Sequence, residues 1–375
     1  MRRAAAVAAL MALAAAPAGA APTASAAAFD AVRARCIAAA GAEQRQEATV
    51  AGLQQQIALV LADAAGRERD IDGSRPQQAH LLGVLAFLAR HRADPSVAAD
   101  ETRLDRRRGD LLMRAVAPQL GAEAQALVGE ISEIARLRRE ATARRPELAA
   151  AEMALAADRG RLARLVAQRL AQTRALLPDA ADAAALGHMA ERAKDLGELI
   201  RLADAATERR DRLLAVRRRG DPTRPAVLRA FDPPQSALRP PVFGTIIQRF
   251  GEPDPAGTLS RGLIVAAALP GADVVAPFDG RVVYAGAFRD LGPLLIIRNG
   301  ALYHSVLGGL GRIGVVADEW VAAGEPVGAM PQTPASSAGS DATGVGSALY
   351  FEVRRNGQPV DPQPWLAQIA QDAKQ

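Results

Sequence analysis

Hydrophobic positions recur with helical spacing over the first two-thirds of the chain. A repeat of seven is clearest between residues 120 and 177, at Leu127, Ile134, Ala141, Leu148, Leu155 and Leu162. A patchier companion seam contains Ile131, Leu137, Ala151 and Leu165. Between residues 29 and 67 a weaker, alanine-rich stripe follows similar spacing, at Val32, Cys36, Val50, Leu53, Ile57, Val60 and Ala64. Such spacing with polar residues between predicts two long helices in a coiled coil.

The breaks in this pattern suggest how the two helices are arranged. The Gly73-Ser74-Arg75-Pro76 segment is predicted to end the first helix, and Pro146 is predicted to kink the second or to begin a new one. Two helical segments within one chain favour an antiparallel hairpin. A parallel dimer of two chains stays open as the alternative.

A third helical segment precedes a stretch without periodicity. Residues 182–216 are amphipathic, with one apolar face formed by Leu186, Met189, Ala193, Leu196, Leu199, Ile200 and Ala203. Residues 217–241 are rich in Arg, Pro, Gly and Asp, which predicts a mobile linker.

The last third of the chain changes from helical to strand-like patterning. Short β-branched and aliphatic runs alternate with Gly, Pro and Asp, at 242–250, 262–267, 273–276, 281–284, 294–298, 302–307 and 349–354. Runs of this length between turn residues predict a compact, mostly antiparallel β-domain. The predicted fold class is therefore multidomain α+β, with an N-terminal helical coiled-coil hairpin and a C-terminal β-domain.

The first 26 residues have the pattern of a secretory signal peptide. Arg2 and Arg3 precede an apolar stretch at residues 4–16, and A-x-A-type cleavage sites follow at residues 18–20 and 24–26. No later run is apolar enough to cross a membrane, so we expect an exported, soluble protein. Cys36 is the only cysteine, which excludes an intrachain disulfide.

Composition adds a basic surface to this picture. The formal charge is +5 and the pI is near 10.0, largely because of arginine. Such a surface favours anionic partners such as the acidic polymers and lipids of a bacterial envelope. An arginine-rich composition from a GC-rich genome explains the charge equally well, and no nucleic-acid partner is predicted.

The order of motifs in the last third resembles the LytM (M23-type, lysostaphin-like) metallopeptidase fold. The motifs that carry this resemblance are SRGLIV at 260–265, VAPFDGRVVYAG at 275–286, YHSVLGGL at 303–310, VAAGEPVG at 321–328, ALYFEVRR at 348–355 and PVDP at 359–362. Each is weak alone, and the ordered set is specific. The resemblance implies an M23-like domain over residues 242–368.

The positions that carry zinc and catalysis in active members of that family are altered in this chain. The resemblance places them at Ser260, Ile264, Gly309, Ala348 and Tyr350. A catalytic zinc needs about three N, O or S ligands, and neither isoleucine nor alanine can provide one. The predicted domain has one histidine, His304, and no cysteine. We therefore predict no metal, no cofactor and no peptidase activity.

The whole layout resembles the murein hydrolase activators of the EnvC type. It comprises a signal peptide (1–26), a coiled-coil region (27–216) with a candidate regulatory helix (182–205), a linker (217–241) and the degenerate domain. The resemblance implies a periplasmic protein that docks through its coil to an FtsE–FtsX-type membrane complex at the division site. It also implies that the groove binds the inhibitory helix of an N-acetylmuramoyl-L-alanine amidase, so that septal peptidoglycan is cut.

A groove without zinc ligands is apolar with charged rims, which suits an amphipathic helix. We expect the groove to be lined by Arg261, Ile264, Leu291, Leu294, His304, Tyr350 and Arg354. The loop at 334–346 is expected to lie beside it. The alternative function is a peptidoglycan-binding scaffold that activates no amidase, and a hydrolase of unconventional chemistry is disfavoured by the missing ligands.

Overall fold

The computed structural model describes residues 20–92, 101–177, 183–216, 221, 223–225, 228–229, 231, 238–253, 257–332 and 348–366. The chain divides into two compact units, the first made of Met1–Ala48 with Leu155–Gln375 and the second of Thr49–Ala154. Residues 1–19 of the predicted signal peptide and the predicted loop at 334–346 lie outside the described residues. None of the described helices is long and apolar enough to span a bilayer.

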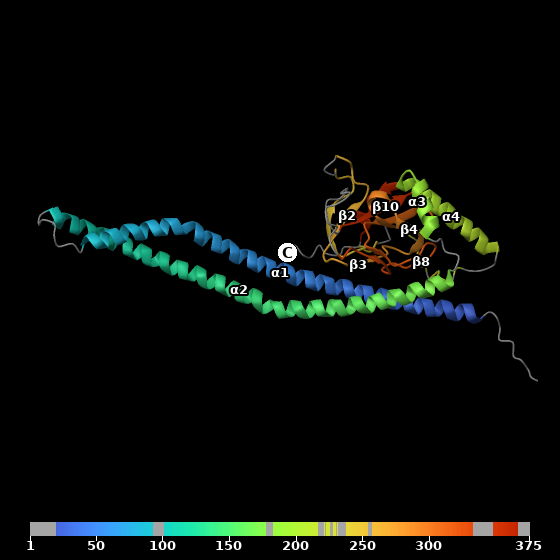
Figure 1. Ribbon diagram of the computed structural model, residues 1–375, viewed down its shortest axis with the longest axis horizontal. Helices are drawn as coiled ribbons and strands as arrows, with labels where there is room; N and C mark the ends of the chain where they lie inside the picture. The colour runs from blue at the N-terminus through green and yellow to red at the C-terminus, as the bar shows by residue number, and fades with distance from the viewer. Residues whose placement is uncertain are drawn as a thin grey trace, which may run out of the picture. The chain divides into compact units, whose positions relative to one another are not determined.

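Two long helices, α1 (Ala20–Arg92) and α2 (Glu101–Leu176), pair with each other in antiparallel fashion. In the first unit Cys36 of α1 packs with Leu165 of α2, and Ala40 packs with Leu162. In the second unit Ala64 of α1 packs with Ile134 and Leu137. As the residue number increases along α1, the number of its contact partner in α2 decreases. The predicted antiparallel hairpin is confirmed (Figure 1).

The heptad pattern correctly identified most of the buried stripe. Ile134, Ala141, Leu155 and Leu162 are buried, and Leu127 and Leu148 are partly buried. Ile131 of the companion seam is an exception, with 53% of its surface exposed.

The prediction that residues 73–76 end the first helix is wrong. α1 continues through Pro76, and α2 likewise continues as one helix through Pro118 and Pro146. Each proline removes one backbone hydrogen bond. The turns on either side keep theirs, and Ile71 beside this segment packs against the cluster of Ala64, Ile134 and Leu137.

The predicted single helix at 182–216 is two helices, α3 (Ala183–Arg192) and α4 (Leu196–Val216). The break follows from capping at Asp195. Its Oδ1 accepts a hydrogen bond from the Glu198 N–H at 2.8 Å, and Glu198 Oε2 accepts one from the Lys194 N–H at 2.8 Å. This reciprocal arrangement starts a new helix. We call α3, α4 and their connection (183–216) the arm.

The β-domain contains two antiparallel sheets. The strands are β1 (Gly244–Gln248), β2 (Leu263–Ala267), β3 (Asp273–Val275), β4 (Gly280–Ala287), β5 (Pro293–Asn299), β6 (Tyr303–Gly308), β7 (Arg312–Ile313), β8 (Trp320–Val321), β9 (Pro326–Ala329), β10 (Ala348–Arg355) and β11 (Gln358–Val360). The large sheet has the order β1-β2-β10-β6-β5-β4-β8, with β11 on β10, and the small sheet has the order β3-β9-β7. Short 3₁₀ turns lie at η1 (Arg289–Leu291) and η2 (Gln363–Trp365).

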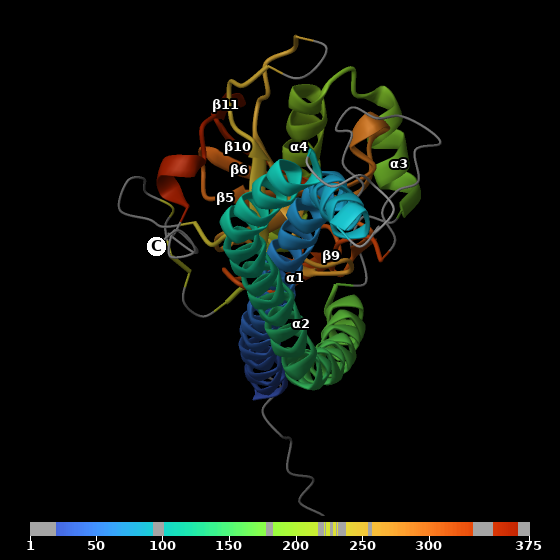
Figure 2. The same ribbon diagram turned by 90° about the vertical axis from the view of Figure 1, so that its left-hand side faces the viewer.

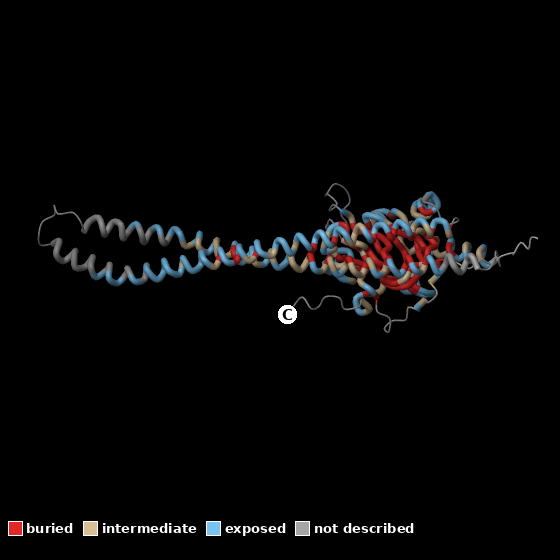
Figure 3. Tube along the Cα trace, turned by 90° about the horizontal axis from the view of Figure 1, so that it is seen from below, coloured by how far each residue is buried: buried red, intermediate tan, exposed pale blue. Residues whose placement is uncertain are grey.

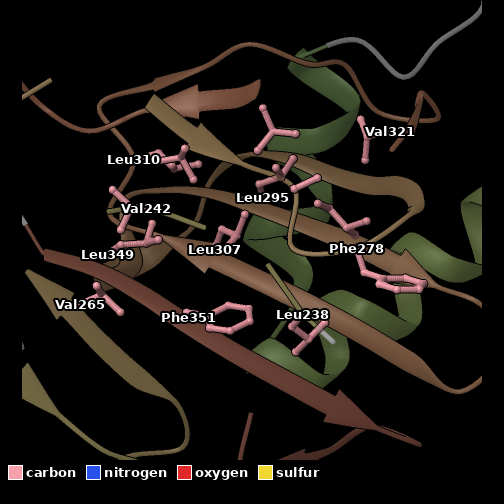
Figure 4. Close-up of a cluster of buried hydrophobic side chains, with 14 of the residues drawn as sticks. Leu238, Val242, Val265, Phe278, Leu295, Leu307, Leu310, Val321, Leu349 and Phe351 are labelled. Atoms are coloured by element: carbon pink, nitrogen blue, oxygen red, sulfur yellow. The ribbon is translucent and has the colours of Figure 1, made fainter. Parts of the chain in front are cut away.

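The main core lies between the inner face of the large sheet and the small sheet. Alternate residues of the central strands, including Leu295, Leu307, Leu349 and Phe351, are fully buried there (Figure 4). Buried positions of the molecule are concentrated in the β-domain, as Figure 3 shows. The prediction of a helical hairpin followed by an antiparallel M23-like β-domain is confirmed.

The described residues of the predicted linker are attached to the β-domain rather than free of it. Arg229 forms an ion pair with Asp279 at 2.9 Å. Phe231 stacks against Phe278 and Tyr303, with ring centroids 5.0 and 4.9 Å apart. Leu238 is 1% exposed within the main core. Isolated aromatic and aliphatic residues in an arginine- and proline-rich stretch carry no periodic signal, so their burial was not predictable.

Candidate functional site

The outer face of the large sheet presents three rows of side chains, one row per register position. The first row contains Ile264, Tyr350, Gly308, Leu294 and Gly286. The second contains Glu352, Val306, Ile296 and Tyr284. The third contains Arg354, His304, Arg298 and Arg281. Successive side chains of a strand point to opposite faces, so the alternate residues belong to the main core.

The predicted groove residues fall on two of these rows. Ile264, Leu294 and Tyr350 share the first row, and Leu291 joins them because its carbonyl accepts the Gly309 N–H at 2.9 Å. His304 and Arg354 lie in the third row. Arg261 is exposed just before β2, and Ala348 pairs with Ala266 at the start of β10.

The residues at the former zinc positions do not fit a zinc ion. Ile264 has no donor atom, and the Ser260 hydroxyl donates to the Gly262 carbonyl at 2.8 Å. The Tyr350 hydroxyl donates to Glu352 at 2.7 Å, and burial together with the Glu352 charge raises the pKa of this phenol well above its ordinary value. A neutral, hydrogen-bonded phenol is not a zinc ligand of the usual kind. Within the described parts of the chain, no three His, Cys, Asp or Glu side chains are placed to hold a metal.

A buried network links Tyr350, Glu352 and Arg354 along β10. Glu352 is 0% exposed and accepts hydrogen bonds from the Tyr350 hydroxyl and from Arg354 Nη1, the latter at 2.8 Å. The remaining guanidinium nitrogens of Arg354 donate to the Gly357 carbonyl. Burial raises the pKa of Glu352, whereas these two donors lower it. Arg354, expected at the rim of the groove, is therefore largely committed within the domain.

The arm covers the β4–β5–β6 half of this face (Figure 1). The apolar side of the arm predicted from sequence forms one cluster with Val283, Tyr284, Phe288, Leu294, Ile296 and Val306. From the arm, Leu199, Ala193 and Ala203 are 0% exposed and Ile200 is 3% exposed. Figure 2 shows α3 and α4 beside the sheet from a second direction. The arm thus occupies part of the predicted groove.

Polar contacts add to this packing at the third row. Asp204 of α4 lies 3.0 Å from His304 Nε2 and 3.6 Å from Arg298 Nη1. Asp211, two turns further along α4, pairs with Arg281 and lies 4.0 Å from Arg298 Nη2. Arg289 Nη2 donates to the Ala193 carbonyl at the end of α3 at 2.6 Å.

The first turn of α4 also faces the groove. A side chain at Gly197 would lie 3.3 Å from Arg354 Nη2, so the backbone there approaches this guanidinium closely. The pKa of Asp195 is lowered by the Glu198 N–H first, and also by Arg201 and Arg354. Arg354 therefore contributes to the environment of the arm as well as to the network on β10.

Sequence reasoning missed the arginines and aspartates of this contact. Arg281, Arg289, Arg298, Asp204 and Asp211 were not among the predicted site residues. Two carboxylates seven residues apart beside an apolar helical stripe were a usable signal, because positions i and i+7 share a helix face. The cationic partners on the sheet carried no such local signal.

Comparison with known proteins finds similarity in the C-terminal third of the chain. Residues 258–362 match Peptidase family M23. A lipoprotein NlpD/LppB homolog of Pseudomonas aeruginosa is 37% identical over 127 residues, 34% of this chain and 38% of that protein. The murein hydrolase activator EnvC of Escherichia coli K12 is 32% identical over 126 residues, 34% of this chain and 28% of that protein. A solved structure of a zinc containing peptidase from Vibrio cholerae is 24% identical with a TM-score of 0.30, covering 38% of this chain and 41% of that chain.

The matches to these two curated proteins are confined to the C-terminal third of this chain and span 38% and 28% of the relatives' own lengths. Within that third, the matched residues form the antiparallel sheets described above. Residues 258–362 are therefore a domain of the peptidase M23 family.

Proposed function

We propose that this protein is a non-catalytic activator of peptidoglycan amidases that acts in the bacterial periplasm during daughter-cell separation. The observation that carries the proposal is an M23 sheet face without zinc ligands whose apolar half is covered by amphipathic helices of the same chain. A face that accepts one amphipathic helix has the shape and chemistry to accept another. The similarity of the domain to EnvC and NlpD proteins, named murein hydrolase activators, supports the same proposal.

In the proposed mechanism the arm and the inhibitory helix of an amidase compete for the outer face. The arm holds the activator closed. When the arm leaves, the face binds the amidase helix and withdraws it from that enzyme's zinc site. The trigger is an event at the coiled coil, whose proposed partner is an FtsE–FtsX-type membrane complex. A ligand with differential affinity for the open state is required for such a shift.

The proposal is tested by dye release from labelled peptidoglycan with an N-acetylmuramoyl-L-alanine amidase from the same organism. An open variant of the full chain, Ile200→Lys, is expected to raise release by the amidase at least about tenfold over the wild type, because Ile200 is 3% exposed on the side of the arm that packs against the sheet. Adding Tyr350→Ala or Arg261→Glu is expected to remove most of that gain. Arg355→Glu is the matched control, because Arg355 lies over the Tyr303 ring on the inner side of the sheet.

Three outcomes would contradict the proposal. Release by the protein without amidase would indicate a hydrolase. Sedimentation with isolated cell-wall sacculi, without any effect of the open variant on an amidase known to be activatable, would favour the peptidoglycan-binding scaffold. Equal loss of activity in the Arg355→Glu control would mean that the outer face is not the binding surface.

A further inference from the structure

The third row of the outer face is an unusual concentration of basic residues. Arg354, His304, Arg298 and Arg281 stand side by side on four neighbouring strands. We call these four residues the basic row. Adjacent strands lie about 5 Å apart, so side chains in one row interact strongly. Cations at this spacing repel each other unless carboxylates lie between them.

Two members of the basic row have carboxylates of their own in the β-domain. Arg281 Nη2 lies 3.2 Å from Asp318 Oδ1, and Arg354 Nη1 lies 2.8 Å from Glu352 Oε1. These pairs persist whether or not the arm is present. Arg281 and Arg354 therefore stay neutralised when the outer face opens.

The other two members depend on the arm. Across the described ranges, Arg298 forms ion pairs with Asp204 and Asp211 alone, and His304 pairs with Asp204 alone. Both aspartates belong to α4. The side chains of Arg298 and His304 are 20% and 8% exposed in the closed state. Departure of the arm therefore removes every carboxylate that forms an ion pair with Arg298 or His304 among the described residues.

This dependence sets a requirement on whatever replaces the arm. A replacement that covered the apolar rows with an uncharged helix would hold the Arg298 guanidinium in a partly desolvated place without a counter-ion, which is unfavourable. A helix with carboxylates at the positions of Asp204 and Asp211 avoids that cost. These positions are seven residues and two helical turns apart, about 10.5 Å along the axis.

We propose that the partner helix that binds the open face carries two carboxylates two turns apart beside its apolar stripe, and that Arg298 selects for them. The proposal rests on the proposed function, because it names the chemistry of the partner at the same site. Specificity follows from electrostatic complementarity, since an uncharged or basic helix with the same apolar stripe is rejected.

The first test measures peptide binding and needs no amidase. A labelled peptide of residues 183–216 is titrated into full-length Ile200→Lys protein and compared with the same peptide carrying Asp204→Asn and Asp211→Asn. We expect the neutral peptide to bind at least about tenfold more weakly. Against Ile200→Lys protein that also carries Arg298→Gln, the difference between the two peptides is expected to shrink at least about threefold, and the Asp211–Arg281 and Asp204–His304 pairs account for the difference that remains. Equal binding of both peptides to the Ile200→Lys protein that keeps Arg298 would overturn the proposal.

The second test uses the amidase. Arg298→Glu in the Ile200→Lys background is expected to lower amidase activation at least about tenfold, Arg298→Lys to retain most of it, and Arg355→Glu to change it little. Activation by the Arg298→Glu protein is expected to return when an acidic residue of the amidase helix is changed to Lys. Undiminished activation by Arg298→Glu would also overturn the proposal. Absence of activation by the Ile200→Lys parent would count against the proposed function, and the peptide measurement would still decide the charge requirement.

Discussion

At the scale of single residues, the clearest consequence of burial is at Glu43 of α1. Its side chain is 1% exposed and lies near Glu47, Asp273 of β3 and Arg159 of α2. Arg159 Nε lies 3.2 Å from Glu43 Oε1, and the other oxygen, Oε2, is buried without a hydrogen-bond partner. Burial first, and then the Asp273 carboxylate, raise the pKa of Glu43 to about 9. Glu43 therefore keeps its proton at neutral pH.

This protonation makes stability depend on pH. Because the folded-state pKa of Glu43 lies above its unfolded value of 4.5, the group stabilises the folded state below pH 4.5 and loses that contribution as the pH rises toward 9. Glu43→Gln removes the ionisation cost. We expect its free energy of unfolding to exceed that of the wild type at pH 8 by roughly 2–5 kcal/mol, and the difference to shrink toward pH 4.5.

The measurement is urea denaturation at a series of pH values, with Glu147→Gln as the control. Glu147 is exposed on α2, so its replacement leaves the pH dependence unchanged. A gap between Glu43→Gln and wild type that grows as the pH falls would contradict the assignment of the proton to Glu43.

At the scale of elements, the arm combines two kinds of interaction that respond to different changes. Its apolar side packs on the second row of the sheet, and its aspartates face the basic row. The hydrophobic part is insensitive to salt, whereas exposed ion pairs weaken as ionic strength rises. We therefore expect Leu199, Ile200 and Ala203 to contribute most of the stability of the packed arm. The ion pairs of Asp204 and Asp211 with the basic row are expected to determine which helix the face accepts.

A single substitution on the buried side of α4 is expected to release the arm. In Ile200→Lys the new ammonium group meets the apolar cluster and the basic row, both of which disfavour it. We expect limited proteolysis within α4 to become at least about tenfold faster, with the β-domain still protected. Leu213→Lys is the matched control on the same helix, because Leu213 is 56% exposed. Equal acceleration in both variants would mean that α4 opens without regard to its packing.

At the scale of the whole molecule, a buried ionic cluster joins the base of the helical hairpin to the β-domain within the first unit. Arg169 of α2 lies 2.5 Å from Glu325 and 3.3 Å from Glu319, and all three side chains are 0% exposed. Arg33 of α1 lies 3.1 Å from Glu325 and donates to the Trp320 and Thr223 carbonyls. Burial raises the pKa of Glu319, and Arg169 lowers it. The helices and the β-domain are thus expected to unfold together in this unit.

Removing one cation from this cluster is expected to be costly. Arg169→Met leaves two buried carboxylates with reduced compensation, so we expect the free energy of unfolding to fall by about 3–5 kcal/mol. Arg161→Met on the same helix is the control, since that side chain is 66% exposed, and we expect a change within about 0.5 kcal/mol. Chemical denaturation followed by circular dichroism measures both. A loss of helical signal without loss of the β-domain in Arg169→Met would contradict joint unfolding.

How much of this could be predicted from sequence differs between the fold and the site. Periodicity identified the hairpin at Ile134, Leu155 and Leu162, because each turn of a helix repeats the same local pattern. The continuous passage of α1 through Pro76 was missed, because one proline costs one hydrogen bond and the surrounding turns can retain the helix. The strands β7, β8, β9 and β11 are too short to leave a periodic signal.

The sequence by itself excluded zinc ligation by two of the former zinc and catalytic positions, since the side chains of Ile264 and Ala348 have no ligand atom in any fold. It also determined the apolar side of the arm, because that side is a local property of one helix. Only the tertiary structure decided that this side lies on β4–β6, that Arg298 faces Asp204, and that Arg169 is buried against Glu325. Each of these contacts joins residues far apart in the chain, and the geometry that brings them together comes from packing of whole elements.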